Sequence, residues 1–159
     1  WSDPGFPQTD RHPVTCVSYD DAVAYAAWLS EKTGGLYRLP SEPEWEYAAR
    51  AGAEGRFAHG DADAELCRHA NVADATAAQA FAGWIAAPCE DGATYTAPVA
   101  SYRPNGFGLH DMHGNLWEWV ADCQSDSLRH FLPPEQAGGA RPDGLCQAGA
   151  PRIIRGGSW

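Results

Sequence analysis

One stretch of sixteen residues, Pro104 to Trp119, constrains the fold more than any other part of the sequence. It opens with Pro-Asn-Gly, a turn signal, because proline fixes φ while Asn and Gly tolerate positive φ. Gly108 and Gly114 add two further positions where the backbone can bend tightly. Between the bends stand five large apolar residues that suit a buried rather than a solvated loop: Phe107, Leu109, Leu116, Trp117 and Trp119. We therefore expect an irregular, buried loop here rather than a helix or a strand.

Two carboxylates, Asp111 and Glu118, stand within the same stretch. Calcium takes about six to eight oxygen ligands from carboxylates, amides and backbone carbonyls. Irregular backbone leaves carbonyls free for this purpose, so two acids within eight residues on a glycine-broken loop predict a calcium site. The alternative interpretation is ordinary capping of loop backbone by Asp and Asn side chains.

The composition limits the class of protein. A chain of 159 residues fits one domain, 1–159, and we interpret the abrupt start at Trp1 and stop at Trp159 as truncation at both ends. Seventeen Gly and twelve Pro argue against a helix bundle or a sheet of long strands. The net charge of −10 argues against nucleic acid as a partner. No apolar run approaches the ~18 residues that a membrane span requires.

Two capping boxes predict two helices. The Ser-Tyr-Asp-Asp sequence at 18–21 opens a helix that stops before Gly34, and Ser-Glu-Pro-Glu at 41–44 opens one that ends at Gly52. Short β-branched or apolar runs predict strands at 12–17, 36–39, 95–99 and 152–155. The tract 75–87 and the polar segment 124–150 are predicted to be loops.

Five cysteines are present. Their contexts favour two pairs, Cys67 with Cys89 and Cys123 with Cys146, because each pair brackets a poorly patterned segment, with Cys16 left over. Sequence alone does not fix the connectivity. The alternative is five reduced thiols in a cytoplasmic protein. Paired cysteines would favour a periplasmic or extracellular location.

Three blocks in order resemble the formylglycine-generating enzyme (sulfatase-modifying factor) family: YRLPSEPEWEYAARAG at 37–52, GFGLHDMHGNLWEW at 106–119 and RGGSW at 155–159. The resemblance extends from about His12 to Trp159. It implies an α+β fold of the C-type-lectin-like, formylglycine-generating type, rich in loops, with short strands and two helices.

The resemblance also implies two calcium sites and a cleft. The first site would combine the side chains of Asn71 and Asp91 with the carbonyls of Val72 and Ala93. The second would combine the side chains of Asp111 and Glu118 with the carbonyls of Gly114 and Leu116. Asp111 stands where family members often have Asn, which adds negative charge. The cleft candidates are Trp117 and Ser158.

The resemblance implies oxidation of a cysteine in a protein or peptide substrate. In the family a cysteine pair just beyond the Gly-Gly-Ser-aromatic motif binds copper, so copper is expected only if such cysteines lie beyond Trp159. None of the five cysteines matches these positions, so the sequence fixes no catalytic residue. A non-catalytic protein of the same fold that binds or displays variable ligands is the alternative, and an accessory domain of a larger protein is a third.

Other catalytic arrangements lack support in the sequence. His110 and His113 are close in sequence, but nothing completes a zinc or iron site around them. A serine nucleophile is not indicated either, because no Gly-x-Ser-x-Gly elbow is present.

Overall fold

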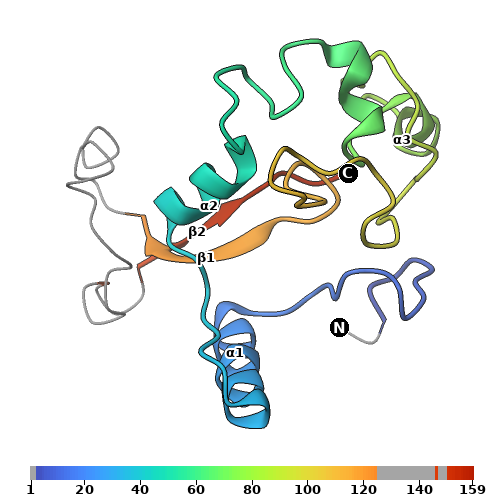
Figure 1. Cartoon of the computed structure of the whole chain (residues 1–159). Helices are drawn as coiled ribbons and strands as arrows, with labels where there is room; N and C mark the ends of the chain where they lie inside the picture. The colour runs from blue at the N-terminus through green and yellow to red at the C-terminus, as the bar shows by residue number, and fades with distance from the viewer. Residues whose placement is uncertain (1–2, 125–145, 147–149) are drawn as a thin grey trace. The chain divides into compact units, whose positions relative to one another are not determined.

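The computed structural model describes residues 3–124, 146 and 150–159. In chain order its elements are α1 (Tyr19–Thr33), α2 (Glu42–Arg50), the 3-10 helix η1 (Asp63–Arg68), α3 (Ala75–Ala80), β1 (Glu118–Cys123) and β2 (Arg152–Arg155). β1 and β2 pair in a two-stranded sheet, and loops connect the remaining elements (Figure 1). The prediction of a loop-rich α+β fold is confirmed. Most of the predicted loop 124–150 lies outside the described residues.

The chain divides into two compact units. The loop unit comprises Trp1–Cys16, Tyr47–Glu118 and Gly156–Trp159, and the helix unit comprises Val17–Glu46 and Trp119–Arg155. The boundaries fall inside α2 and β1, so each of these elements contributes residues to both units. The prediction of a single domain over 1–159 stays a prediction.

Local capping signals account for the predicted helix α1. The Ser18 hydroxyl accepts a hydrogen bond from the Asp21 N–H, and the Asp21 carboxylate accepts one from the Ser18 N–H at 2.9 Å. Gly34 ends the helix in the left-handed conformation, with φ 75°. No residue of α1 is buried, so end caps rather than side-chain burial define this helix.

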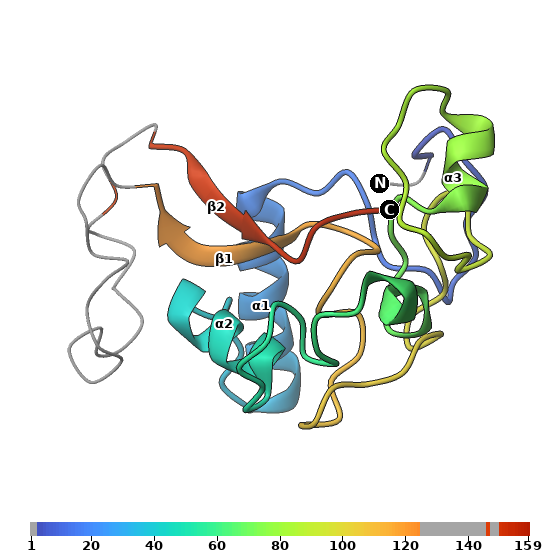
Figure 2. The same ribbon diagram turned by 90° about the horizontal axis from the view of Figure 1, so that it is seen from above.

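The first turn of α2 also belongs to the helix unit and carries the second predicted box. The Ser41 N–H donates to the Glu44 carboxylate at 2.8 Å, and the Glu44 N–H donates to the Ser41 hydroxyl at 3.3 Å. The Arg38 guanidinium, at 2.7 Å from the same carboxylate, lowers the pKa of Glu44 to about 2. The Asp122 carboxylate on β1 accepts a hydrogen bond from the Glu42 N–H at 2.6 Å. These contacts attach the start of α2 to the two-stranded sheet, whose strands lie side by side in Figure 2.

The loop unit is held largely by buried polar residues. Its buried apolar side chains are small apart from one leucine: Ala49, Leu66, Cys67, Ala70, Ala77 and Ala97. Its buried polar residues are nearly as numerous as its buried apolar ones: Thr15, Asn71, Asp74, Thr96 and Asn115. Buried polar groups need hydrogen-bond partners, so irregular backbone here is fixed by specific side-chain bonds.

Three predicted strands are wrong. Residues 12–17, 36–39 and 95–99 form no strand in the structure, whereas β2 matches the run predicted at 152–155. Cys16 has φ 55°, a left-handed conformation that interrupts an extended run, and the other two runs find no ladder partner. The tract predicted as a loop at 75–87 begins with α3, because the Asp74 carboxylate caps the Ala77 N–H.

Both predicted disulfides are present. Cys67 is bonded to Cys89 in the loop unit, and Cys123 to Cys146 in the helix unit. Cys16 is unpaired and exposed. Across the described residues, none of the helices combines the length and hydropathy that a membrane crossing demands.

Candidate functional site

The loop from Pro104 to Trp117 has the irregular backbone that its sequence predicts. Asp111, Gly114 and Asn115 all adopt positive φ, at 58°, 71° and 61°. The Asn105 side chain fixes the first bend, because its carbonyl oxygen accepts hydrogen bonds from the N–H groups of Phe107 and Leu109 at 3.0 and 3.1 Å. The prediction of a tightly bent loop is therefore confirmed as far as Trp117, but it is wrong for Glu118 and Trp119, which begin strand β1.

The expectation that its apolar side chains are buried is wrong for three of them. Phe107, Leu109 and Trp117 are 49%, 40% and 56% exposed. The buried anchor is instead Asn115, which is 2% exposed. Its side chain accepts from the Ala97 N–H at 3.0 Å and donates to the Ala97 carbonyl at 3.2 Å. The Asn115 amide therefore holds the loop in place, whereas the sequence analysis expected buried apolar side chains to do so.

Gly114 is required by a close approach of two backbones. Asn71 and Gly114 form a parallel bridge, and the Asn115 N–H donates to the Asn71 carbonyl at 2.8 Å. A Cβ atom on Gly114 would stand 1.9 Å from the Asn71 carbonyl oxygen. No residue but glycine fits here without displacing the backbone. The contact brings the two predicted calcium sites next to each other in the loop unit.

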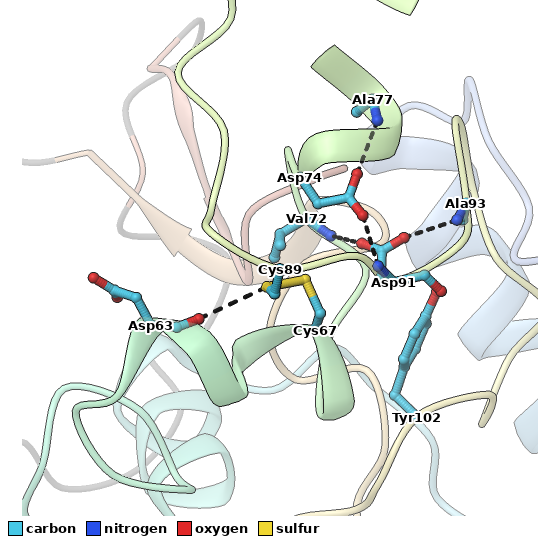
Figure 3. Close-up of a disulfide and its surroundings, with 9 residues drawn as sticks. All are labelled: Asp63, Cys67, Val72, Asp74, Ala77, Cys89, Asp91, Ala93 and Tyr102. Atoms are coloured by element: carbon cyan, nitrogen blue, oxygen red, sulfur yellow. Dashed lines mark hydrogen bonds between the residues drawn. A yellow bond between two sulfur atoms is a disulfide. The ribbon is translucent and has the colours of Figure 1, made fainter. Parts of the chain in front are cut away.

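Three residues of the first predicted site, Val72, Asp91 and Ala93, come together from segments about twenty residues apart (Figure 3). The Asp91 carboxylate accepts hydrogen bonds from the N–H groups of Val72 and Ala93, each at 2.8 Å. Burial raises the pKa of Asp91, against the effect of these two hydrogen bonds. Burial also raises the pKa of the Tyr102 phenol, whose hydroxyl donates to the Asp91 carbonyl at 3.5 Å. Val72 and Ala93 thus contact the Asp91 carboxylate through their N–H groups, whereas the predicted calcium ligands are their carbonyls, so the ligand set stays a prediction.

Two buried oxygen atoms in the described residues lack any hydrogen-bond partner, and both belong to predicted calcium ligands. They are Asn71 Oδ1 and Asp111 Oδ1. Asn71 is completely buried, while its Nδ2 donates to the Tyr95 carbonyl at 2.7 Å. The other Asp111 oxygen accepts from the Ala100 N–H at 2.8 Å. A buried acceptor without a donor is costly, and a bound cation would satisfy it, so the donor set fits a hard metal ion.

The remaining predicted residues lie around the same loop. Leu116 and Glu118 are half-buried and flank the exposed Trp117. The Ser158 hydroxyl donates to the Asn115 carbonyl at 3.4 Å, and the Gly114 N–H donates to the Gly156 carbonyl at 2.8 Å. The Gly-Gly-Ser-Trp motif thus contacts the loop that carries the second predicted site.

The Asp74 carboxylate lies close to that of Asp91, although Asp74 was not among the predicted ligands. Ligand atoms of Cys67, Asp74 and Asp91 all lie within 4.8 Å of one another, the one such metal-binding group among the described residues. Cys67 is in a disulfide and offers no thiolate, which leaves the two carboxylates. The signal in the sequence was the N-cap position of Asp74 ahead of an alanine-rich tract.

Among the described residues, no group of histidines with the ligand atoms of a metal site is found. The His110 ring lies 2.7 Å from the Tyr102 carbonyl through Nδ1, and the His113 ring lies 3.4 Å from the Ala58 N–H through Nε2. A cavity of about 80 Å³ beside Asp111 is lined in part by His59, His69 and His113. The His59 and His69 rings stack with their centroids 4.4 Å apart, and burial lowers the pKa of His59.

Comparison with known proteins shows the family of the chain. The profile of the family described as "Sulfatase-modifying factor enzyme 1-like domain" matches residues 2–159. The formylglycine-generating enzyme of Thermomonospora curvata is 41% identical over 98% of this chain and 48% of its own length. That of Streptomyces coelicolor is 40% identical over 94% of this chain and 42% of its own.

A solved structure gives the same result. PvdO from Pseudomonas aeruginosa has a TM-score of 0.68 and 36% sequence identity, covering 97% of this chain and 52% of that protein. The chain spans about half the length of the relatives it matches. Since the family profile covers nearly every residue, the chain belongs to the sulfatase-modifying factor family, and it is a domain of the formylglycine-generating-enzyme type.

Proposed function

We propose that the protein oxidises a cysteine side chain in a protein or peptide substrate, with O2 as the oxidant and a thiol reductant as the source of two electrons. The CH2–SH group becomes an aldehyde, and H2S and water are released. We also propose that calcium stabilises the loops around the cleft. The observation that carries this proposal is the contact between the family's two cleft motifs. The Gly114 N–H donates to the Gly156 carbonyl, which joins the Gly-Gly-Ser-Trp motif to the loop that leads into the Trp-Glu-Trp motif.

The cleft candidates suit binding of an extended peptide. Trp117 is 56% exposed, although a tryptophan that served only the core would be buried. Ser158 lies next to the same loop through its hydroxyl, which donates to the Asn115 carbonyl. An exposed ring on the loop that the Ser158 hydroxyl contacts can pack against apolar groups of a peptide, which supports a peptide substrate.

Calcium would be held at two sites. Asn71, Asp91 and the carbonyls of Val72 and Ala93 would supply one, and the unpartnered Asn71 Oδ1 supports this assignment. The other would use the side chains of Asp111 and Glu118 and two backbone carbonyls, those of Gly114 and Leu116. The unpartnered Asp111 Oδ1 supports it in the same way. Bound calcium would order irregular chain around the cleft and would take no part in electron transfer.

Copper does not fit the cysteines of this chain. Four of the five cysteines are in disulfides, and Cys16 stands alone in the loop unit, far in sequence from the Gly-Gly-Ser-Trp motif. We therefore derive no step through copper from these residues. The disulfides themselves support an oxidising compartment.

The test uses the full-length polypeptide that contains this sequence. It is incubated with a cysteine-containing peptide, a copper salt, a thiol reductant and oxygen, and the product aldehyde is trapped with an aminooxy probe. A peptide with serine in place of cysteine is the control. We expect labelled product from the cysteine peptide alone, and a slower rate for Trp117→Ala.

Equal labelling of the two peptides would contradict cysteine oxidation. Binding of the cysteine peptide without any aldehyde would then favour the alternative, a non-catalytic ligand-binding protein of the same fold.

A further inference from the structure

The two chain segments that carry the first predicted calcium site are held side by side by backbone hydrogen bonds. The Ala75 N–H donates to the Cys89 carbonyl at 3.2 Å, and the Ala87 N–H donates to the Ala73 carbonyl at 2.7 Å. The disulfide from Cys67 to Cys89 adds a covalent link just ahead of both ligand segments (Figure 3). The position of one segment therefore determines the position of the other.

Asp74 connects these segments through its side chain. One carboxylate oxygen accepts a hydrogen bond from the Ala77 N–H at 2.8 Å and caps α3. The other accepts from the backbone N–H of Asp91 at 2.6 Å. Asp74 is completely buried. Its carboxylate thus sets the backbone position of the residue that supplies the site's predicted acid.

The two carboxylates lie close enough to repel each other. Oxygen atoms of Asp74 and Asp91 lie within 4.8 Å, and the Cys67 sulfur at the same distance carries no charge in a disulfide. Two like charges at this separation in a buried place are unfavourable unless a cation lies near them. A separate observation supports a ligand in this part of the loop unit, because Oδ1 of Asn71, the residue before Val72, is buried without a hydrogen-bond partner.

We propose that Asp74 is a second carboxylate of the Asn71–Asp91 cation site, which positions Asp91 through its backbone N–H and adds a negative charge that strengthens cation binding. The inference rests on the proposed calcium site and concerns a residue outside the ligand set that the family resemblance implies. Asp74 acts as a positioning residue, since both of its oxygens already accept backbone hydrogen bonds.

The test is a titration of the full-length polypeptide with Ca²⁺ and with Tb³⁺. All variants carry Glu118→Ala, which weakens the second predicted site so that the titration reports on the first. Asp74→Asn keeps the shape of the side chain and can still cap α3 through its oxygen. It removes the charge and also the acceptor for the Asp91 N–H, because the amide NH2 group cannot accept a hydrogen bond. We expect it to lower the affinity for Ca²⁺ about 10- to 100-fold. The loss for Tb³⁺ should be larger, because the Coulomb energy grows with the charge of the ion.

Two further variants complete the design. Glu90→Gln removes an exposed carboxylate next to Asp91 in sequence and should change both affinities less than about twofold, because exposed charges are screened. Asp74→Glu restores the charge and should recover part of the affinity. If Asp74→Asn does not fold, Asp74→Ser, which also caps α3 without a charge, replaces it.

The outcomes separate the two proposals. If the Glu118→Ala parent binds neither ion, the calcium site itself is wrong and the inference with it. If the parent binds and Asp74→Asn binds equally well, only the inference is overturned. Equal losses for Ca²⁺ and Tb³⁺ also overturn it, because a purely structural role of Asp74 does not depend on the charge of the ion.

Discussion

Helix α1 and the loops around Asn71 are ordered by different means. α1 has both of its caps within its own sequence and buries no residue. The loops contain almost no regular structure, yet three of their polar residues, Asn71, Asp74 and Asn115, are buried. Each of the three forms hydrogen bonds to residues distant in sequence or to a separate segment.

The difference indicates which interactions stabilise each region. A helix that is defined by caps depends on local bonds, each worth about 1 kcal/mol. A loop that is held by buried amides and carboxylates depends on complete satisfaction of those groups, because each unsatisfied one costs about 1–3 kcal/mol. The loop region should therefore tolerate substitution and loss of cations far less well than α1.

The largest effect is expected at Gly114. Gly114→Ala should prevent the loop from closing on Asn71, because the new Cβ would stand 1.9 Å from the Asn71 carbonyl oxygen. We expect a loss of more than about 3 kcal/mol in the free energy of unfolding, measured by urea denaturation. Gly108→Ala is the matched control. Gly108 also has a positive φ, 78° against 71° at Gly114, but nothing lies within 4 Å of the added Cβ atom. Equal losses for the two variants would show that backbone strain, and not the close approach, matters.

The next largest effect is expected at Asn115. Asn115→Ala leaves the Ala97 N–H and carbonyl without their side-chain partner, which should cost about 2–4 kcal/mol of unfolding free energy. Glu31→Ala, an exposed position on α1, should change the same quantity by less than about 0.5 kcal/mol. Similar values for both would remove the distinction between the two regions.

A smaller effect is expected at the cap of α1. Ser18→Ala removes the acceptor for the Asp21 N–H and should cost about 1 kcal/mol, measured by urea denaturation. Ser18→Asn, which retains a capping side chain, should lose less than half as much. A loss comparable to that of Asn115→Ala would mean that α1 is held by more than its caps.

The smallest effect is expected for the pH dependence of stability that arises from the Arg38–Glu44 ion pair. The pKa of Glu44 is about 2 in the folded protein against 4.5 as the reference, so the Arg38–Glu44 pair stabilises the fold above pH 4.5 and loses that contribution as the pH falls toward 2. Because both side chains are largely exposed, we expect only about 0.5 kcal/mol. Glu44→Gln should be less stable than the wild type at neutral pH, with the difference shrinking in thermal unfolding as the pH falls. A difference that grows in acid would contradict this sign.

The sequence predicted what local rules determine. The caps at Ser18 and Ser41, the strand β2 and the glycine-broken loop follow from nearby residues, and the structure contains all of them. Both favoured disulfides are also present, although the sequence did not fix their connectivity. The strand predicted at 12–17 failed because Cys16 takes a left-handed conformation that its own residue type does not indicate.

The site itself was predicted only in part. Asn71 and Asp91 were assigned from family resemblance, since no local rule connects residues twenty apart. Asp74 was missed because its role arises from a bond to the Asp91 N–H across two segments. The exposure of Trp117 was missed because apolar patterning does not reveal that Asn115, two residues earlier, provides the anchor.

The central claim is that the loop region is ordered around cations while α1 is not. Hydrogen exchange of the full-length polypeptide, followed by mass spectrometry with calcium and with a chelator, tests it most directly. We predict that removal of calcium accelerates exchange in peptides covering 71–74, 91–93 and 111–118 and leaves the peptide covering Tyr19–Thr33 unchanged. Equal exchange in these loops with and without calcium would contradict the claim.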